Sequence, residues 1–241
     1  MNSASADHRR MFWDDYSEIY SKREFLTIQP AKVLLSHLEI ETAKSILEVG
    51  CGLGTCSRLI ANKMNPETNL TITDFSSKMI SATCSKFLLP TKHIVIETAD
   101  ALELKYKDKS FDRYISNLVL HLVVDPDLML KEARRVLSDD GIACFSIWGD
   151  PQNSLLFYLH GNGFQQQFEL SSDLHVLKSR FIKAGFNRVV MWRFQSQYEL
   201  WNVQKVLDFW EDGKISRECV ECAFANGIPI GVEFLIIFCK P

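Results

Sequence analysis

The sequence has no apolar run of the length, about 20 residues, that spans a bilayer. Its first residues, MNSASADHRRMFWDD, contain no apolar segment of the kind found in secretory signals. It also has no excess of basic charge, because the formal net charge of the 241 residues is −3, and such a chain exerts no overall attraction on nucleic acids. We therefore expect a cytoplasmic or nuclear protein with neither a membrane nor a nucleic acid as partner.

Disulfide frameworks and zinc motifs are missing as well. The seven cysteines are odd in number and accompany no signal sequence, which favours reduced thiols over disulfides. Cys219 and Cys222 form a CxxC pair, but no second CxxC and no paired histidines complete a set of four zinc ligands. We predict no metal site, and we expect both thiols to lie on one face of a helix and to pack into the core.

The sequence does contain helical periodicity in its first 42 residues. Phe12, Tyr16 and Tyr20 recur every four residues and predict an apolar stripe on a helix over 8–24. A second helix is predicted over 29–40, with Pro30 in its first turn, where proline is tolerated.

From residue 43 the pattern changes to short runs rich in Ile, Val, Phe and Tyr, which alternate with helix-like segments. Ser76 or Ser77 caps one predicted helix, and another begins after Asp125 and ends before Gly141. This alternation indicates parallel strands with crossover helices. The strands are predicted over 44–50, 69–74, 93–100, 111–117 and 141–149.

The last third of the chain continues with a helix over 173–186, a strand over 188–195, two helices within 199–225 and a final strand over 232–240. No internal repeat or proline-rich linker interrupts the order, so we expect residues 1–241 to form one α/β domain with a sheet covered on both faces. In such sheets ligands bind at the carboxyl ends of the strands.

Three glycines, Gly50, Gly52 and Gly54, follow the first predicted strand in the stretch ILEVGCGLGTCS. Bare backbone in a strand-to-helix turn lets a ligand approach closely, although tight turns use glycine for their own geometry too. The dinucleotide pattern GxGxxG is absent, because Thr55 or Ser57 stands where its third glycine would be. The phosphate loop GxxxxGK[ST] is absent as well, since no lysine follows the glycines.

The spacing Glu48-x-Gly50-x-Gly52-x-Gly54 resembles the first motif of class I S-adenosylmethionine-dependent methyltransferases. Residues 44–148 are similar to the small-molecule branch called methyltransferase type 11. The resemblance implies a Rossmann-like, doubly wound, seven-stranded sheet, mostly parallel with the last strand antiparallel, and helices on both faces. It assigns cofactor binding in this loop to Glu48, Gly50, Cys51, Gly52 and Gly54.

The resemblance extends to the ends of the next three strands. It implies that Asp74 holds the two ribose hydroxyls of S-adenosylmethionine, and a carboxylate suits that role because its two oxygens face two donors. Taken singly, Asp74 and Asp100 could equally cap a helix or end a strand, and Met79 could be core. The other residues that the resemblance assigns to the cofactor are Phe75 and Met79 on the adenine ring, Asp100 and Ala101 on its edge, and Asn117 and Leu118 near the ammonium.

Residues outside the core motifs are harder to place. Tyr16 and Tyr20 resemble an N-terminal lid over the cofactor, and an aromatic stripe that packs on the sheet is an equal alternative. His121 is the candidate base or substrate ligand, against the alternative of a structural histidine. We expect the acceptor to contact residues 149–171 and the helices within 199–227, with Trp148, Phe157, Tyr158 and His160 as candidate lining residues.

These observations predict methyl transfer to a small molecule by in-line displacement, in which positioning supplies most of the catalysis. The expected organisation is a helical lid over 1–42, a cofactor-binding core over 43–148 and a substrate-side cap over 149–241, in a monomer or homodimer. The alternatives are a catalytically silent subunit that binds a protein partner, a protein or RNA methyltransferase, and an NAD-dependent oxidoreductase of similar fold.

Overall fold

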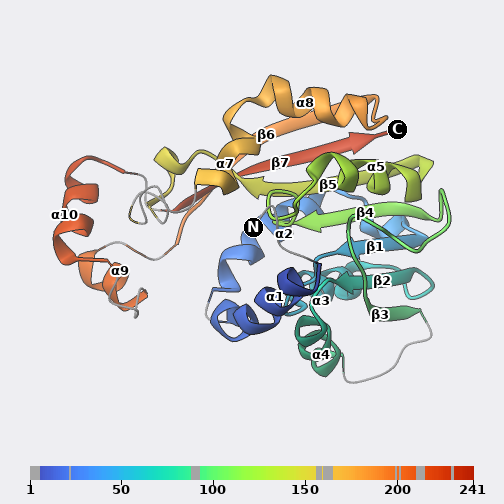
Figure 1. The fold of residues 1–241 in the computed structure, drawn as a ribbon, viewed down its shortest axis with the longest axis horizontal. Coiled ribbons are helices and arrows are strands. Elements are labelled where there is room, and N and C mark those ends of the chain that lie inside the picture. Colours follow the sequence, from blue (N-terminus) through green and yellow to red (C-terminus); the bar gives the residue numbers. More distant parts are fainter. Residues whose placement is uncertain are drawn as a thin grey trace.

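A computed structural model describes residues 6–21, 23–87, 93–155, 159, 165–198, 200, 202–209, 215–228 and 231–241. Its centre is a seven-stranded sheet with the order β3-β2-β1-β4-β5-β7-β6 (Figure 1). The neighbours from β3 to β5 pair in parallel, and β7 pairs antiparallel with both β5 and β6. The expected doubly wound sheet with an antiparallel last strand is confirmed. The strands are β1 (Ser45–Val49), β2 (Asn69–Asp74), β3 (Ile94–Thr98), β4 (Phe111–Asn117), β5 (Leu137–Trp148), β6 (Arg188–Ser196) and β7 (Val232–Lys240).

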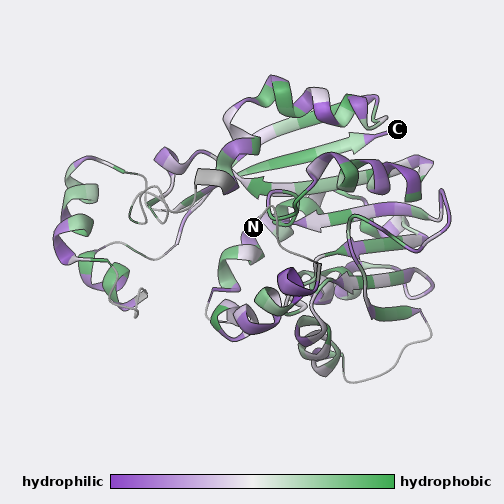
Figure 2. Cartoon of the chain, in the orientation of Figure 1, coloured by the Kyte–Doolittle hydropathy of each residue, from purple (hydrophilic) through white to green (hydrophobic). Residues whose placement is uncertain are grey.

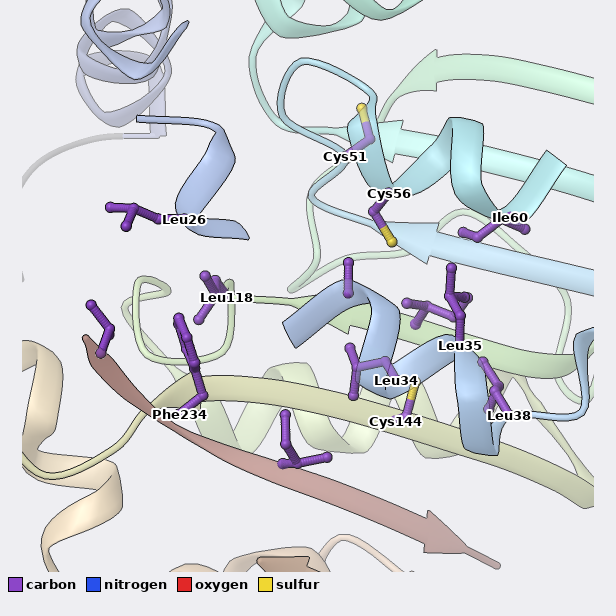
Figure 3. Packing of buried hydrophobic residues seen from close by; sticks show 14 of the residues in the cluster. Leu26, Leu34, Leu35, Leu38, Cys51, Cys56, Ile60, Leu118, Cys144 and Phe234 are labelled. Carbon is purple, nitrogen blue, oxygen red and sulfur yellow. The ribbon is translucent and has the colours of Figure 1, made fainter. Parts of the chain in front are cut away.

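Helices cover both faces of the sheet. The helices that pack on it are α2 (Phe25–His37), α3 (Thr55–Lys63), α4 (Ser77–Lys86), α5 (Pro126–Val136) and α8 (Leu174–Lys183). Residues of α2 and α3 join one buried cluster with one set of strand side chains, and residues of α5 and α8 join a second cluster with the opposite set. Figure 3 shows the first cluster between α2, α3 and the sheet, with Leu34 and Leu38 near Cys144 and Ile60 near Leu35. Residues 141–147 of β5 and 232–237 of β7 are all buried, and most of them are hydrophobic (Figure 2).

The N-terminal helices begin earlier than predicted. Helix α1 spans Ala6–Ser21, and α2 starts at Phe25, so Pro30 lies inside α2 and not in its first turn. An internal proline leaves the carbonyl four residues earlier without its helical donor. Here that carbonyl belongs to Leu26, and it accepts a hydrogen bond from the Tyr198 hydroxyl over 3.0 Å. The prediction was wrong because the compensating donor lies 172 residues away in the sequence.

Helix α5 ends before Gly141, as predicted, but its C-cap is Leu137 and not this glycine. Helix α5 stops at Val136, and β5 begins at the next residue, Leu137. The pairing of β4 with β5 shifts between Phe111 and Arg113, so Gly141 lies in a bulged part of the strand. A glycine at a bulge packs closely where a side chain would clash, and a Cβ at Gly141 would lie 2.7 Å from the Leu137 side chain.

The C-terminal third adds a short 3₁₀ helix and a short α-helix beside the sheet, and a pair of α-helices farther from it. The element η2 (Pro151–Asn153) follows β5, and α7 (Gln165–Ser172) precedes α8. Helices α9 (Val203–Phe209) and α10 (Arg217–Ala225) pack against each other at one end of the molecule, apart from the sheet (Figure 1). A 3₁₀ turn, η1 (Ile40–Thr42), joins α2 to β1.

Cys219 and Cys222 lie on α10, as expected, but both are exposed, so the expectation of core packing was wrong. The buried residues of this helix are Val220 and Ala223, each one position further along. One residue rotates the helix by about 100°, which turns both thiols out to solvent. Cys219, Cys222 and the other five cysteines are free.

Two further observations concern the described ranges only. None of their helices combines the length and the apolar composition that crossing a bilayer requires. Their His, Cys, Asp and Glu side chains also form no group of three or more that could hold a metal ion.

Candidate active site

A pocket opens at the carboxyl ends of β1, β2, β3 and β4, where ligands of doubly wound sheets bind. The strands end side by side, so residues from four distant stretches of sequence meet there. Ten of the predicted cofactor residues line this pocket, namely Tyr20, Gly50, Gly52, Asp74, Phe75, Met79, Asp100, Ala101, Asn117 and Leu118. Glu48, Cys51, Gly54, Tyr16 and His121 are not among its lining residues.

The glycine loop owes its bare backbone to two causes. All three glycines have positive φ values, +78° at Gly50, +54° at Gly52 and +83° at Gly54, which side chains rarely adopt. A Cβ at Gly50 or Gly54 would also strike the protein itself, at 2.2 Å from Val119 and 2.8 Å from Thr83. At Gly52 the space belongs to the pocket and to Tyr20, whose ring would lie 3.1 Å from a Cβ. Gly50 and Gly52 both line the pocket, so these two glycines are where the loop can touch a ligand.

Asp74 is fixed by the loop that faces it. Its Oδ2 accepts a hydrogen bond from the Gly52 amide, and its Oδ1 accepts one from the Ser76 amide, each over 2.9 Å. Each oxygen keeps a further lone pair, so the carboxylate has room for two hydroxyl donors. Burial raises the pKa of Asp74 to about 6, and the backbone hydrogen bonds oppose that rise.

Glu48 lies beneath the loop and not in the pocket wall. Glu48 is 1% exposed, and neither of its carboxylate oxygens has a hydrogen-bond partner among the described residues. Burial raises the pKa of Glu48 to about 7, although the nearby Ser57 hydroxyl and Cys56 thiol favour the charged form. The adjacent Cys51 thiol is also buried, and its pKa is raised by that burial and by Asp74 and Glu48. Both residues support the loop from inside.

The adenine-side candidates lie where β2 and β3 end. The Arg10 guanidinium lies over the Phe75 ring, 4.7 Å from its centroid, so one face of this ring is covered by the protein. Met79 is 3% exposed and lies at the pocket wall in the first turn of α4. The Asp100 Oδ1 accepts a hydrogen bond from the Leu102 amide over 2.9 Å, so this side chain also shapes the turn after β3.

The turn after β4 has an unusual backbone. Leu118 has φ +60°, a conformation that is uncommon for a residue with a side chain. Its amide donates to the Ser146 carbonyl and to the Ser146 hydroxyl, each over 3.0 Å. The neighbouring Asn117 side chain is bound to Ser146 on one side and to Thr27 on the other. The turn is therefore held by β5 and α2.

Helix α1 supplies Arg9, Trp13 and Tyr20 to the pocket wall. It lies beside α4 (Figure 1) and contacts the start of that helix. Asp14 accepts hydrogen bonds from the Ser76 hydroxyl and, over 3.2 Å, from the Lys78 amide. Tyr20 rests on Gly52, and burial raises the pKa of its hydroxyl. Tyr16 stacks with Phe12, at 5.8 Å between ring centroids, and does not line the pocket.

Several lining residues escaped the sequence analysis. Arg9 and Trp13 share one face of α1 with Tyr20, at spacings of four and seven residues, while the predicted stripe ran through Phe12 and Tyr16. Counting back seven residues from Tyr20 reaches Trp13, and counting back four more reaches Arg9, so helical periodicity could have found this face. The others, Val49, Ala99, Leu102, Val119, Leu122, Val123 and Val124, are apolar neighbours of predicted residues and carry no separate signal.

His121 is 8% exposed and lies beside Trp148, with 5.7 Å between ring centroids. Burial lowers its pKa to about 3, so the imidazole is neutral at neutral pH. Neither ring nitrogen has a hydrogen-bond partner among the described residues. A role as base or substrate ligand stays a prediction. The candidate lining residues Phe157, Tyr158 and His160 lie outside the described residues.

Comparisons with known proteins agree with this geometry. Residues 47–145 match the sequence model of a family described as "Methyltransferase domain". A demethylmenaquinone methyltransferase of Lactobacillus johnsonii is 30% identical over 127 residues, which are 52% of this chain and 52% of that protein. A malonyl-[acyl-carrier protein] O-methyltransferase of Marinomonas is 24% identical over 182 residues, 72% of this chain and 66% of that protein. The chain thus spans about half to two thirds of the length of these two curated relatives.

Among solved structures, a Haloferax volcanii putative methyltransferase in complex with the Trm112 activator is similar in fold. Its TM-score is 0.67 at 16% identity, and the match covers 95% of this chain and 97% of that one. At this identity the likeness shows the fold alone. The family model covers the residues that form the glycine loop and the ends of β2, β3 and β4. Residues 47–145 are thus similar to the class I S-adenosylmethionine-dependent methyltransferases.

Proposed function

We propose that this protein transfers a methyl group from S-adenosylmethionine to a small-molecule acceptor. The observation that carries the proposal is the convergence of Gly52, Asp74, the Asp100–Ala101 turn and the Asn117–Leu118 turn on one pocket. These residues come from four separate loops, and each has the chemistry expected for a different part of the same nucleoside. A dinucleotide is not supported, because the sequence lacks the glycine spacing that binds a pyrophosphate.

The donor set fits that nucleoside part by part. Asp74 supplies two oxygens to the ribose hydroxyls, and Gly52 allows the backbone to approach without a side chain. We propose that Asp100 and Ala101 contact the adenine edge and that the backbone at Asn117 and Leu118 faces the amino-acid end, since all four residues line the pocket. When bound, S-adenosylmethionine supplies a methyl group on a positively charged sulfur, which is ready to leave.

The work left to the protein is mainly positioning and exclusion of water. Holding the two reactants in line can lower the activation barrier by several kcal/mol, and by roughly 7 to 11 kcal/mol in the best intramolecular cases. The apolar residues Val119, Leu122, Val123 and Val124 line the pocket, and α1 supplies part of its wall. We propose that α1 acts as the lid that keeps water from the transferred methyl group.

The class of acceptor is proposed from the pocket and from the relatives. The lining after β4 is apolar, and the neighbouring His121 and Trp148 rings are uncharged at neutral pH. The similar proteins named above act on a demethylmenaquinone and on a malonyl group carried by a protein. We propose an acceptor that is largely apolar where it enters the pocket.

Calorimetric titration with S-adenosylhomocysteine and with NADH tests the cofactor. We expect micromolar binding of S-adenosylhomocysteine and no heat from NADH. Asp74→Ala should weaken binding by about 1.5 to 3 kcal/mol, the typical value of hydrogen bonds to a charged group. Asp108→Ala, an exposed carboxylate outside the pocket lining, is the control and should bind as the wild type does.

The pH dependence of the same titration gives a second check on Asp74. Ribose hydroxyls donate to the ionised carboxylate, and the pKa of Asp74 in the free protein is about 6. The affinity for S-adenosylhomocysteine should therefore rise between pH 5 and pH 7, and Asp74→Asn should flatten that rise. An unchanged affinity in both variants would show that the ribose lies elsewhere.

Incubation of metabolite extracts with S-adenosylmethionine labelled in the methyl group tests the transfer. A labelled small molecule supports the proposal, and mass analysis identifies it. Binding of the cofactor without any labelled product would favour the alternative of a catalytically silent subunit. Label in protein or RNA would favour a macromolecular acceptor.

A further inference from the structure

A chain of hydrogen bonds connects the turn after β4 to β5 and α2. Ser146, which is fully buried in β5, donates from its hydroxyl to the Asn117 Oδ1 over 2.7 Å. The same hydroxyl oxygen accepts from the Leu118 amide over 3.0 Å. The Asn117 Nδ2 in turn donates to the Thr27 carbonyl in α2 over 3.1 Å. One buried hydroxyl therefore binds both the backbone and the side chain of the turn.

The turn needs this support because its backbone conformation is unfavourable. Leu118 has φ +60°, and a non-glycine residue persists in that region only when its surroundings hold it there. Leu118 is 6% exposed, and its side chain is buried in the cluster that also contains Phe234 (Figure 3). Packing holds the side chain, and Ser146 holds the amide.

The direction of the Leu118 amide decides the direction of the Asn117 carbonyl. The two groups belong to one planar trans peptide, so they point in opposite directions. The amide points to Ser146 on β5, where it has two acceptors, the carbonyl and the hydroxyl. The Asn117 carbonyl then points away from β5, toward the side of β1, the other neighbour of β4. The glycine loop and the pocket begin where β1 ends.

We propose that Ser146 is a positioning residue, which aims the Asn117 carbonyl at the ammonium group of the bound cofactor. This inference rests on the proposed function, since it concerns the amino-acid end of S-adenosylmethionine. Removal of the hydroxyl leaves the Leu118 amide with one acceptor and deprives the Asn117 side chain of one of its two anchors. The peptide is then held by fewer hydrogen bonds, and the direction of the Asn117 carbonyl is less tightly fixed.

The test compares two ligands that differ at the amino-acid end. S-adenosylhomocysteine has that end, and 5′-methylthioadenosine has the adenosine and the sulfur without it. We expect Ser146→Ala to weaken S-adenosylhomocysteine about tenfold, the typical effect of one lost hydrogen bond, and to leave the affinity for 5′-methylthioadenosine unchanged. Ser146→Thr restores the hydroxyl and should return the ratio of the two affinities to the wild-type value.

Ser116→Ala is the matched control. Ser116 is also fully buried in the sheet, on β4, and its hydroxyl has no hydrogen-bond partner among the described residues. Its substitution should change neither affinity. If Ser146→Ala does not fold, Asn117→Ala removes the acceptor of the same hydroxyl while it keeps the backbone carbonyl, and it should show the same selective loss.

The outcomes separate this inference from the function on which it rests. Equal weakening of both ligands in Ser146→Ala, or no weakening of either, overturns the positioning role while the wild type still binds S-adenosylhomocysteine. Absence of binding in the wild type overturns the proposed function itself.

Discussion

Glu48 is a buried carboxylate whose oxygens have no hydrogen-bond partner among the described residues, and its pKa is raised to about 7. In the unfolded chain the pKa of a glutamate is about 4.3. The folded state therefore binds the proton more tightly than the unfolded state does. Its contribution to stability is complete below the unfolded pKa and is lost as the pH rises through about 7.

Glu48→Gln should remove this pH-dependent loss. The amide cannot ionise, so the variant should gain stability relative to the wild type as the pH rises from 5 to 8. A difference of roughly 2.5 pKa units corresponds to about 3 kcal/mol at most. Urea denaturation of both proteins at several pH values measures the difference. Parallel curves would mean that the carboxylate has a partner, such as an internal water molecule.

Glu132→Gln is a control of opposite sign. The Glu132 carboxylate accepts hydrogen bonds from the Arg135 guanidinium and from the Leu104 amide, each over 2.8 Å. The Arg135 contacts lower the pKa of Glu132, and burial opposes them. Its contribution is present above the unfolded pKa and is lost as the pH falls, so this substitution should cost stability at pH 7 and less at acidic pH.

At the scale of elements, α2 contains a proline that its own backbone cannot accommodate without help. The Leu26 carbonyl lacks its helical donor because Pro30 has no amide hydrogen. Burial raises the pKa of Tyr198 to about 12, so its phenol stays protonated and donates to Leu26. Tyr198, two residues after the end of β6, thus supplies the hydrogen bond that α2 lacks.

Tyr198→Phe should destabilise the protein by about 1 kcal/mol, because the Leu26 carbonyl then has neither donor. In a Pro30→Ala background the helix supplies its own amide, and the same substitution should cost less. A double-mutant cycle by urea denaturation measures the coupling. The ring contact with Phe25, 5.4 Å between centroids, is kept in this variant. Equal losses in both backgrounds would therefore show that the Tyr198 hydroxyl stabilises the fold through a group other than the Leu26 carbonyl.

The contact of α1 with α4 gives a prediction about access to the pocket. Asp14 joins the two helices through Ser76 and the Lys78 amide. Asp14→Ala should loosen the contact of α1 with α4, so S-adenosylhomocysteine should both enter and leave the pocket faster. Stopped-flow fluorescence of Trp13, which lines the pocket, measures both rates. The control is Asp15→Ala, since the 3.7 Å pair of Asp15 with the Lys78 ammonium is exposed and contributes little. Unchanged rates in Asp14→Ala would show that α1 does not gate entry.

Across the whole molecule, the sequence predicted features that depend on neighbouring residues. The five strands of the core follow from short β-branched runs, and the Ser76 and Asp125 caps follow from local side-chain chemistry. The resemblance to class I methyltransferases, carried by the glycine spacing and the acids at strand ends, predicted that Gly52 and Asp74 share one pocket, and both residues line it. Each of these signals lies within about ten residues, so periodicity and capping rules could detect it.

The features that escaped prediction depend on contacts between distant segments. The internal Pro30 is tolerated because of Tyr198, and the exposed Cys219 and Cys222 follow from which face of α10 meets α9. The face of α1 that lines the pocket is set by docking on α4, one residue away from the most apolar stripe. Local periodicity gives the existence of a helix, and tertiary packing decides which face it buries.

Contacts between distant segments also fix the structure at the β5-β7-β6 edge of the sheet. There Glu233 of β7 joins the loop after β5 to β7 and β6. Its carboxylate accepts hydrogen bonds from the Asp150 amide and the Asn153 side chain, each over 2.8 Å, and pairs with Arg193. Glu233 is 6% exposed, whereas the Arg193 side chain is 37% exposed. The carboxylate is thus the shared acceptor on which the loop depends, and the guanidinium is partly hydrated.

Glu233→Ala should therefore lower the free energy of unfolding by about 3 kcal/mol, the lower range for breaking a buried charged pair. Arg193→Met should lower it by less than about 1 kcal/mol, because water and the loop amides still satisfy the carboxylate. Urea denaturation separates these values. Hydrogen exchange locates the effect. The Asp150 amide, which donates to the Glu233 side chain, should exchange faster in Glu233→Ala. The Gly149 amide donates to the backbone carbonyl of residue 233 over 2.8 Å and should keep more of its protection. Equal acceleration at both amides would mean that the side chain holds the whole end of β5, and equal costs for the two substitutions would mean that the ion pair, and not the loop, is what Glu233 supports.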